Sequence, residues 1–272
     1  MSNESFIQNL NTFSDLKLRV SYGITGNDGI GDYQYMPRLK PWGVTISDVF
    51  AGGNEPENLA NPDLKWEETA QTNIGLDMGF FNDKLTATID VYKKRTTDAL
   101  LNIPVGGWWG FGTQRINSGV IDNQGIELGL TGALTDTLDV SSGITYTKSR
   151  LVDVDTDSYK GHQTQNVPKL RATAQLSYKV PSVEGLRLLS GMQYSSSKYA
   201  NKEATAKVGG YSVFNIGAAY KTNFAGHDTT FRFNIDNLFN KKYWRDVGPF
   251  MGDDYLFLGN PRTAQFSTTF NF

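Results

Sequence analysis

The sequence predicts an all-β protein, an antiparallel transmembrane β-barrel of about ten strands. Two observations carry this prediction: apolar and polar residues alternate in about ten segments, and the connections between these segments are alternately short and long. A third observation is compatible with it, because no apolar run approaches the ~20 residues of a membrane-spanning helix. Barrel strands need only ~9–11 residues, of which every second one is apolar.

The composition supports strands with one polar face. The chain of 272 residues has 28 glycines, 16 phenylalanines and 13 tyrosines, but is only 39% hydrophobic. It has no cysteine, which excludes disulfides and cysteine-based zinc or redox sites. The net charge of -2 gives no basic excess for nucleic acid, and we expect no cofactor and no metal site.

Each predicted strand is a run in which residues i, i+2 and i+4 share one face. In the first run Leu16, Leu18 and Val20 alternate with polar side chains such as Lys17 and Arg19. The first five runs cover residues 16–24, 74–80, 85–91, 126–130 and 138–146. The other five cover residues 170–180, 186–194, 214–220, 231–235 and 264–272.

The connections give an independent signal. Those at 81–84, 135–137, 181–185 and 223–228 are short. Those at 26–65, 100–123, 153–169 and 239–262 are long, and a medium one at 201–210 falls on the long side. Outer-membrane barrels have short periplasmic turns and long extracellular loops. A soluble β-sandwich would also show alternating strands, but it does not predict this order of connections.

Aromatic residues near the predicted strand ends are typical of the girdles at membrane interfaces. We assign to these girdles Tyr22, Phe80, Phe81, Tyr92, Tyr178, Tyr194, Tyr220 and Phe272.

Several motifs resemble TonB-dependent outer-membrane transporters. Towards the C-terminus they resemble the ferric-siderophore receptors, and the matching pieces are Val167-Pro-Lys-Leu170, Gly209-Gly-Tyr-Ser-Val-Phe214, Phe233-Asn-Ile-Asp-Asn-Leu-Phe-Asn-Lys-Lys-Tyr243 and Gly259-Asn-Pro-Arg-Thr263. The piece Asn117-Ser-Gly-Val-Ile-Asp-Asn-Gln-Gly-Ile-Glu-Leu128 is also similar to this family. The first third, with Leu18-Arg-Val-Ser-Tyr-Gly-Ile-Thr-Gly-Asn27 and Asn61-Pro-Asp-Leu-Lys-Trp-Glu-Glu-Thr69, resembles the SusC-like branch, which imports glycans or peptides.

The resemblance implies part of a barrel of about 22 strands that surrounds an N-terminal plug. Nothing in the sequence resembles the plug, and residues 1–6 do not read as a signal peptide, so we expect a piece or a processed form of a longer protein. We assign residues 1–14 to an N-terminal extension and 15–272 to a partial barrel. Ten strands either close on themselves, pair with another chain or are unstable alone, because open edges in lipid are costly.

The resemblance implies a bacterial outer-membrane importer, not an enzyme, with a ferric siderophore as the favoured ligand. The implied partners are outer-membrane lipid, the barrel assembly machinery, the small-molecule ligand and, through a plug, the TonB complex. The alternatives are a SusC-like glycan or peptide importer, a self-closed ten-stranded pore or structural barrel, and a hydrolase active at the outer rim.

Candidate ligand-binding residues lie in the long connections, where aromatic rings can stack on sugars or siderophores and arginine can attract anions. They are Trp108, Trp109, Phe111, Arg115, Trp244, Arg245 and Tyr255. The aromatic end of the chain, with Phe266, Phe270 and Phe272, is expected to act as a barrel-insertion signal.

Other motifs are weaker. Asp153, Asp155 and Asp157 alternate as in a calcium loop, but the glycine and glutamate that an EF-hand needs are absent. A rim hydrolase would use His162 with nearby aspartates, and His227 is expected at the opposite end of the barrel.

Overall fold

The structure is a computed structural model that describes residues 12–27, 29, 31–104, 113–153, 159–250 and 253–271. Four candidate residues, Trp108, Trp109, Phe111 and Phe272, lie outside the described residues. The described residues include no helix of the length and apolarity that crossing a membrane requires.

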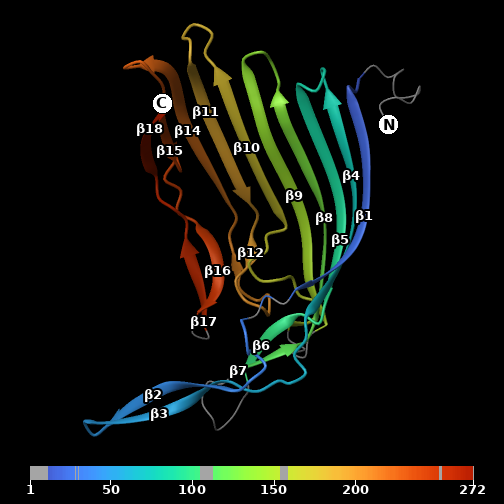
Figure 1. Ribbon diagram of the computed structural model, residues 1–272, viewed down its shortest axis with the longest axis vertical. Helices are drawn as coiled ribbons and strands as arrows, with labels where there is room; N and C mark the ends of the chain where they lie inside the picture. The colour runs from blue at the N-terminus through green and yellow to red at the C-terminus, as the bar shows by residue number, and fades with distance from the viewer. Residues whose placement is uncertain are drawn as a thin grey trace.

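One large antiparallel sheet confirms the predicted strands (Figure 1). Its order is β1-β4-β5-β8-β9-β10-β11-β14-β15-β18, so each strand pairs with the next large strand along the chain. The strands are β1 (Asp15–Asn27), β4 (Glu67–Phe80), β5 (Leu85–Thr97), β8 (Val120–Ala133), β9 (Leu138–Asp153), β10 (Leu170–Lys179), β11 (Leu186–Ser195), β14 (Tyr211–Phe224), β15 (His227–Asp236) and β18 (Thr263–Asn271).

The sheet is curved but open, so the self-closed ten-stranded barrel is wrong for this structure. Within the described residues, β1 pairs only with β4 and β18 only with β15. The two edge strands lie at opposite margins of the sheet in Figure 1. Closing ten strands would need a tighter cylinder than this wall forms, because barrel diameter grows with strand number.

The connections alternate in length as predicted, which defines a short-turn end and a long-loop end of the sheet. Phe81, Asn82 and Asp83 all have positive φ in one short turn, and Ala225 and Gly226 do so in another. These conformations are typical of tight hairpin turns.

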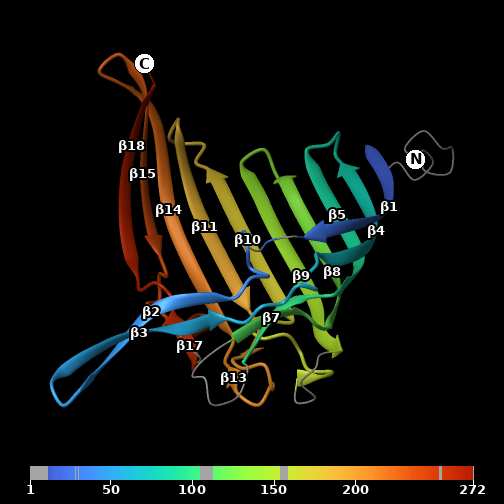
Figure 2. The same ribbon diagram turned by 60° about the horizontal axis from the view of Figure 1, so that its bottom comes forward.

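The long connections contain strands that the sequence did not predict. They are β2 (Arg38–Ile46), β3 (Val49–Asn58), β6 (Leu100–Pro104), β7 (Thr113–Asn117), β12 (Lys198–Tyr199), β13 (Lys207–Val208), β16 (Trp244–Phe250) and β17 (Asp253–Leu258). One small sheet has the order β2-β3-β7-β6, and β12-β13 and β16-β17 are hairpins. Figure 2 shows β2, β3 and β7 at the long-loop end of the large sheet.

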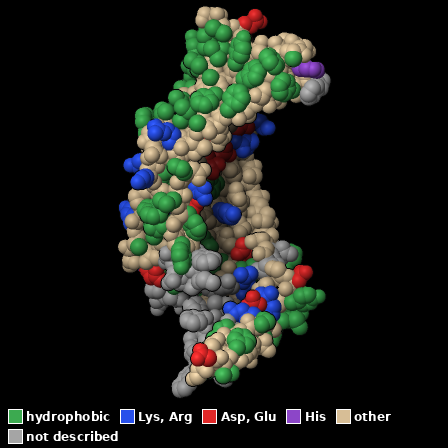
Figure 3. Space-filling model, turned by 90° about the vertical axis from the view of Figure 1, so that its left-hand side faces the viewer, with side chains coloured by type: hydrophobic (Ala, Val, Ile, Leu, Met, Phe, Trp, Pro, Cys, Tyr) green, Lys and Arg blue, Asp and Glu red, His purple; other side chains and the backbone are tan. Residues whose placement is uncertain are grey.

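The outer face of the large sheet is apolar across neighbouring strands. Its side chains form rows in the pairing direction, and Val20, Ile74, Val91, Ile126 and Tyr146 make one such row from β1 to β9. All five side chains are exposed. Hydrophobic side chains also gather on the flank of the sheet that faces the viewer in Figure 3. A continuous exposed apolar face of this size is what lipid covers.

The inner, concave face is polar, and it corrects the assignment of Tyr92 to an aromatic girdle. Tyr92 follows Val91, so it lies on the opposite face from the apolar row. Its hydroxyl lies 3.0 Å from the Thr147 hydroxyl oxygen on β9. Tyr92 therefore joins strands across the interior instead of contacting lipid.

Candidate functional site

A charged network ties three strands together on the inner face. The Arg19 guanidinium of β1 donates two hydrogen bonds of 2.8 Å to Asp77 of β4 and one of 3.0 Å to Asp90 of β5. To reach β5, Arg19 crosses β4 at Gly75, where an added Cβ would lie 2.6 Å from its terminal nitrogen. Glycine on this face therefore lets long side chains lie across a neighbouring strand.

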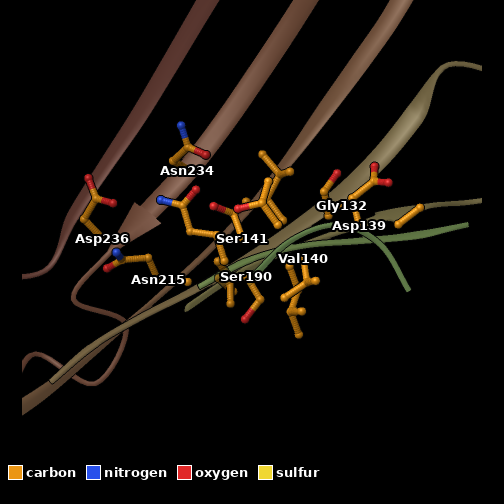
Figure 4. A pocket seen from close by; sticks show the side chains of 17 residues that line it. Gly132, Asp139, Val140, Ser141, Ser190, Asn215, Asn234 and Asp236 are labelled. Atoms are coloured by element: carbon orange, nitrogen blue, oxygen red, sulfur yellow. The ribbon is translucent and has the colours of Figure 1, made fainter. Parts of the chain in front are cut away.

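A trough of about 510 Å³ lies on the inner face between β8 and β15. Its lining includes the uncharged hydrogen-bonding side chains Gln175, Asn215 and Asn234 and the carboxylates Asp139 and Asp236. Figure 4 shows Ser141, Asn215 and Asn234 on one side of the strands and Val140 on the other. Such a lining can exchange hydrogen bonds with a hydroxylated or amide-bearing solute.

A second group of polar residues, here called the rim cluster, lies at the long-loop end. It consists of Asn166, Arg171, Lys198, Tyr211, Tyr243, Arg245 and Asp246. The Lys198 side chain, only 3% exposed, donates a 2.5 Å hydrogen bond to the Arg245 carbonyl oxygen. The Tyr211 and Tyr243 rings lie 4.2 Å apart. The cluster joins three connections that are distant in sequence.

Two asparagines and a glycine place the strands of the rim cluster. Asn237, 3% exposed, accepts a 2.7 Å hydrogen bond from the Lys241 amide and donates one of 2.9 Å to the Asn260 carbonyl oxygen. It therefore ties both ends of the 237–260 connection together. Asn237 and Asn240 both have positive φ, which asparagine tolerates better than most residues. A Cβ at Gly259 would overlap the Tyr243 ring, so the ring can occupy this position only because residue 259 is a glycine.

Ion pairing and burial shift pKa values in the rim cluster, among them those of Asp246 and Lys198. The hydrogen bond from Arg245, at 2.7 Å, is the main reason that the pKa of Asp246 lies below its ordinary value. Burial lowers the pKa of Lys198, although the nearby Asp246 carboxylate opposes this change. Asp246 therefore stays ionised, and it links β16 to Asn166 and Lys198 of two other connections.

The candidate residues that the structure describes do not form one site. Trp244, Arg245 and Tyr255 lie on the β16-β17 hairpin. Trp244 and Tyr255 are separated along it, because Trp244 pairs with Leu258 whereas Tyr255 pairs with Gly248. Arg115 lies on β7, in the separate four-stranded sheet. Of these residues, Arg245 is in the rim cluster. Phe266 and Phe270 lie on β18, and both are exposed.

Other members of the rim cluster were not predicted as candidates. Tyr211 and Tyr243 stand in the Gly-Gly-Tyr and Lys-Lys-Tyr motifs, and the aromatic residue in each was the available signal. Lys198 had no such signal. Across the described residues, no group of histidine, aspartate and glutamate could hold a metal ion. The described Nδ1 atom of His162 has no hydrogen-bond partner, so this atom forms no pair with a carboxylate.

Acidification is expected to release β16 from the rim cluster. The pKa of Asp246 is lower in the folded state, so its contribution to stability is present above the unfolded value of about 3.9 and is lost as the pH falls through the folded value. The protection of the Val247 amide against hydrogen exchange, relative to its intrinsic rate, should fall below about pH 4, because this amide donates to Asn166 at 3.1 Å. The Asp246→Asn variant should lose this pH dependence, and an unchanged dependence would contradict the assignment.

Comparison with known proteins agrees with this architecture. Residues 9–238 match the family model "TonB dependent receptor-like, beta-barrel". The ferric preacinetobactin receptor BauA from Acinetobacter baumannii has a similar fold, with a TM-score of 0.70 and 24% sequence identity over 95% of this chain and 34% of that chain.

Curated relatives match different parts of the chain. TonB-dependent receptor P39 from Formosa agariphila is 41% identical over 48% of this chain and 12% of its own length. TonB-dependent receptor SusC from Bacteroides thetaiotaomicron is 36% identical over 53% of this chain and 15% of its own. The probable siderophore receptor PiuA from Acinetobacter baumannii is 27% identical over 74% of this chain and 27% of its own.

This chain therefore spans a small part of the length of these relatives. The predicted family, the all-β fold and the outer-membrane location are confirmed, because the match covers most of the chain. The chain belongs to the TonB-dependent receptor-like β-barrel family, whose members are outer-membrane proteins of Gram-negative bacteria.

Proposed function

We propose that this chain forms part of the wall of an outer-membrane importer and that its long connections capture the ligand, with a ferric siderophore as the first candidate. The observation that carries the proposal is the polar inner face, which leads from the trough to the rim cluster at the long-loop end. That end is extracellular in barrels of this kind. A solute captured there would meet hydrogen-bonding side chains along the wall.

The rim cluster supports the siderophore as ligand. Arg171, Lys198 and Arg245 lie near a single carboxylate, Asp246, so the cluster has a cationic excess. Two tyrosine rings lie beside these cations. Cations and aromatic rings together suit an anionic ligand with aromatic groups, such as a ferric catecholate. The similarity to PiuA, whose name describes a siderophore receptor, agrees with this proposal.

A glycan or peptide is the second candidate. Amide and hydroxyl side chains of the trough, such as Gln175, Asn215 and Ser141, would suit a polar solute. The 36% identity to SusC over half of the chain also favours the SusC-like branch.

The remaining candidate residues and partners belong to the same proposal. Trp244, Tyr255 and Arg115, with Trp108, Trp109 and Phe111, would contact the ligand from the outer connections. Phe266, Phe270 and Phe272 would be read by the barrel assembly machinery. Energy would come from the TonB complex through a plug, as the resemblance implies.

Ligand capture can be tested by tryptophan fluorescence with three probes: a ferric catecholate, a ferric hydroxamate and a malto-oligosaccharide. We expect the ferric catecholate to quench fluorescence. Replacing Arg245 with glutamine should weaken this binding by roughly tenfold, because the charge-assisted hydrogen bond proposed between its guanidinium and the anionic ligand is lost. The Arg232→Gln variant, which removes a cation from the inner face of β15, should bind like the unmodified chain.

Each outcome discriminates between the candidates. Binding of the oligosaccharide alone would favour the SusC-like proposal over the siderophore. Binding of none of the three probes would contradict both.

A further inference from the structure

Beyond ligand import, the outer face carries a cationic patch directly above the apolar surface. Two rows of paired residues lie between the apolar row of Tyr146 and the long-loop end. The first contains Lys93, Gln124 and Lys148 on β5, β8 and β9. The second contains Arg95, Asp122 and Arg150 on the same strands. Because residues two apart share a face, both rows continue the outer face of Val91, Ile126 and Tyr146.

The charges of this patch are unbalanced. Arg95 pairs with Asp122 at 3.2 Å, which neutralises one cation. Within the described part of the chain, no ion pair involves Lys93, Lys148 or Arg150. The next carboxylate on this face is Glu68, one row further out on β4. Three cations therefore remain uncompensated beside an apolar surface.

A groove connects the cations with the apolar row. It has a volume of about 380 Å³, and Ile74, Val91, Ile126 and Tyr146 line its apolar part. Lys93 and Lys148 line the same groove at the polar side. A second hollow of about 530 Å³ continues from Tyr146 and Lys148 to Arg150. One continuous surface thus joins apolar side chains to three cations.

We propose that this surface binds a lipid of the outer leaflet through a phosphate-bearing headgroup. Lys93, Lys148 and Arg150 would contact the phosphate, and acyl chains would lie along Ile74, Ile126 and the other apolar side chains. The position supports a lipid over a free anion, because the outer-membrane location puts the apolar row in contact with hydrocarbon. Basic side chains at this level attract phosphorylated lipid headgroups. Their aliphatic stems also extend from the apolar surface towards the polar interface.

The proposal can be tested on the protein extracted in mild detergent from its own outer membrane. Native mass spectrometry would count the phosphorylated lipid retained, and added bis-phosphorylated lipid A would give the affinity. The test variant replaces Lys93, Lys148 and Arg150 with glutamine. The matched control replaces Lys17, Lys94 and Arg232, three cations of the inner face, with glutamine.

We expect the test variant to bind lipid A at least about tenfold more weakly, whereas the control binds like the unmodified chain. Lipid A without phosphates should bind weakly to all three proteins. Should the test variant fail to accumulate, the single substitution Lys148→Gln makes the same comparison with Lys94→Gln.

Three results would overturn the proposal. The first is equal lipid retention by the test and control variants. The second is equal binding of lipid A with and without phosphates. The third is displacement of lipid A by millimolar inorganic phosphate, because the surface would then be a site for a free anion.

Discussion

Replacing Leu128 with arginine is expected to destabilise the folded chain in lipid by about 2–4 kcal/mol. Leu128 lies on the outer face of β8, where it pairs with Ile89 of β5 and Ile144 of β9. It is 42% exposed in the structure, and in the membrane this surface meets hydrocarbon. A guanidinium there loses its hydration without gaining a partner. Urea unfolding in lipid vesicles, followed by tryptophan fluorescence, would measure the loss.

The Thr173→Arg variant is the matched control. Thr173 lies on β10, where it pairs with Gly143 and Gln193 on the inner face. The same guanidinium would remain in water there, so we expect a change within about 0.5 kcal/mol. Equal effects of the two variants would mean that the two faces do not differ in their contact with lipid. That result would contradict the outer-membrane orientation of the sheet.

The sheet was predictable because a membrane strand needs one apolar and one polar flank. Apolar and polar residues therefore alternate with a period of two. The strand β10, at Leu170–Lys179, matches the predicted run 170–180 almost residue for residue. Other strands continue beyond their alternating part. β4 begins at Glu67, although the apolar run begins at residue 74. Above the membrane both flanks meet water, so hydrogen-bonded pairing can continue where the sequence no longer alternates.

The hairpins of the long connections lacked this signal. β2 and β3 contain Pro41, Gly43, Gly52 and Gly53, residues that usually mark turns. Their pairing is stabilised locally instead: Gly43 leaves room for the Phe50 ring, which a Cβ at this position would overlap. Sequence periodicity cannot reveal a contact of this kind.

The rim cluster could not be predicted because its members are joined by tertiary structure. Asn166, Lys198 and Arg245 come from three different connections. They meet only once the register of the four intervening strands, β10, β11, β14 and β15, is fixed. Lys198 also contacts a backbone carbonyl, which every residue has. Arg245 is the one member of the rim cluster that was predicted as a candidate, and that prediction rested on its position in an outer loop, not on these partners. Similarly, Tyr92 stands near a strand end, but its place directly after Val91 puts it on the inner face.

The other large effect is expected at Gly125 of β8. The Tyr92 side chain crosses β8 at this glycine to reach Thr147 on β9. A Cβ at position 125 would lie 2.7 Å from the Tyr92 hydroxyl oxygen and would overlap the Tyr146 carbonyl oxygen. The ring can rotate away, but the backbone of a central strand cannot. We expect Gly125→Val to lower the free energy of unfolding by about 3 kcal/mol, measured by the same urea titration.

The control at Gly23 separates this overlap from a general effect of valine. Gly23 also lies on the inner face, and a Cβ there would have no atom within 4 Å. Valine favours strands, so Gly23→Val should leave stability unchanged or raise it by up to about 1 kcal/mol. The Tyr92→Phe variant should cost only about 1 kcal/mol, the contribution of one hydrogen bond. An equally small effect of Gly125→Val and Gly23→Val would contradict this geometry. It would mean that β9 does not lie as close to β8 as the pairing of Gly125 with Thr147 requires, and that the register of these two strands is wrong.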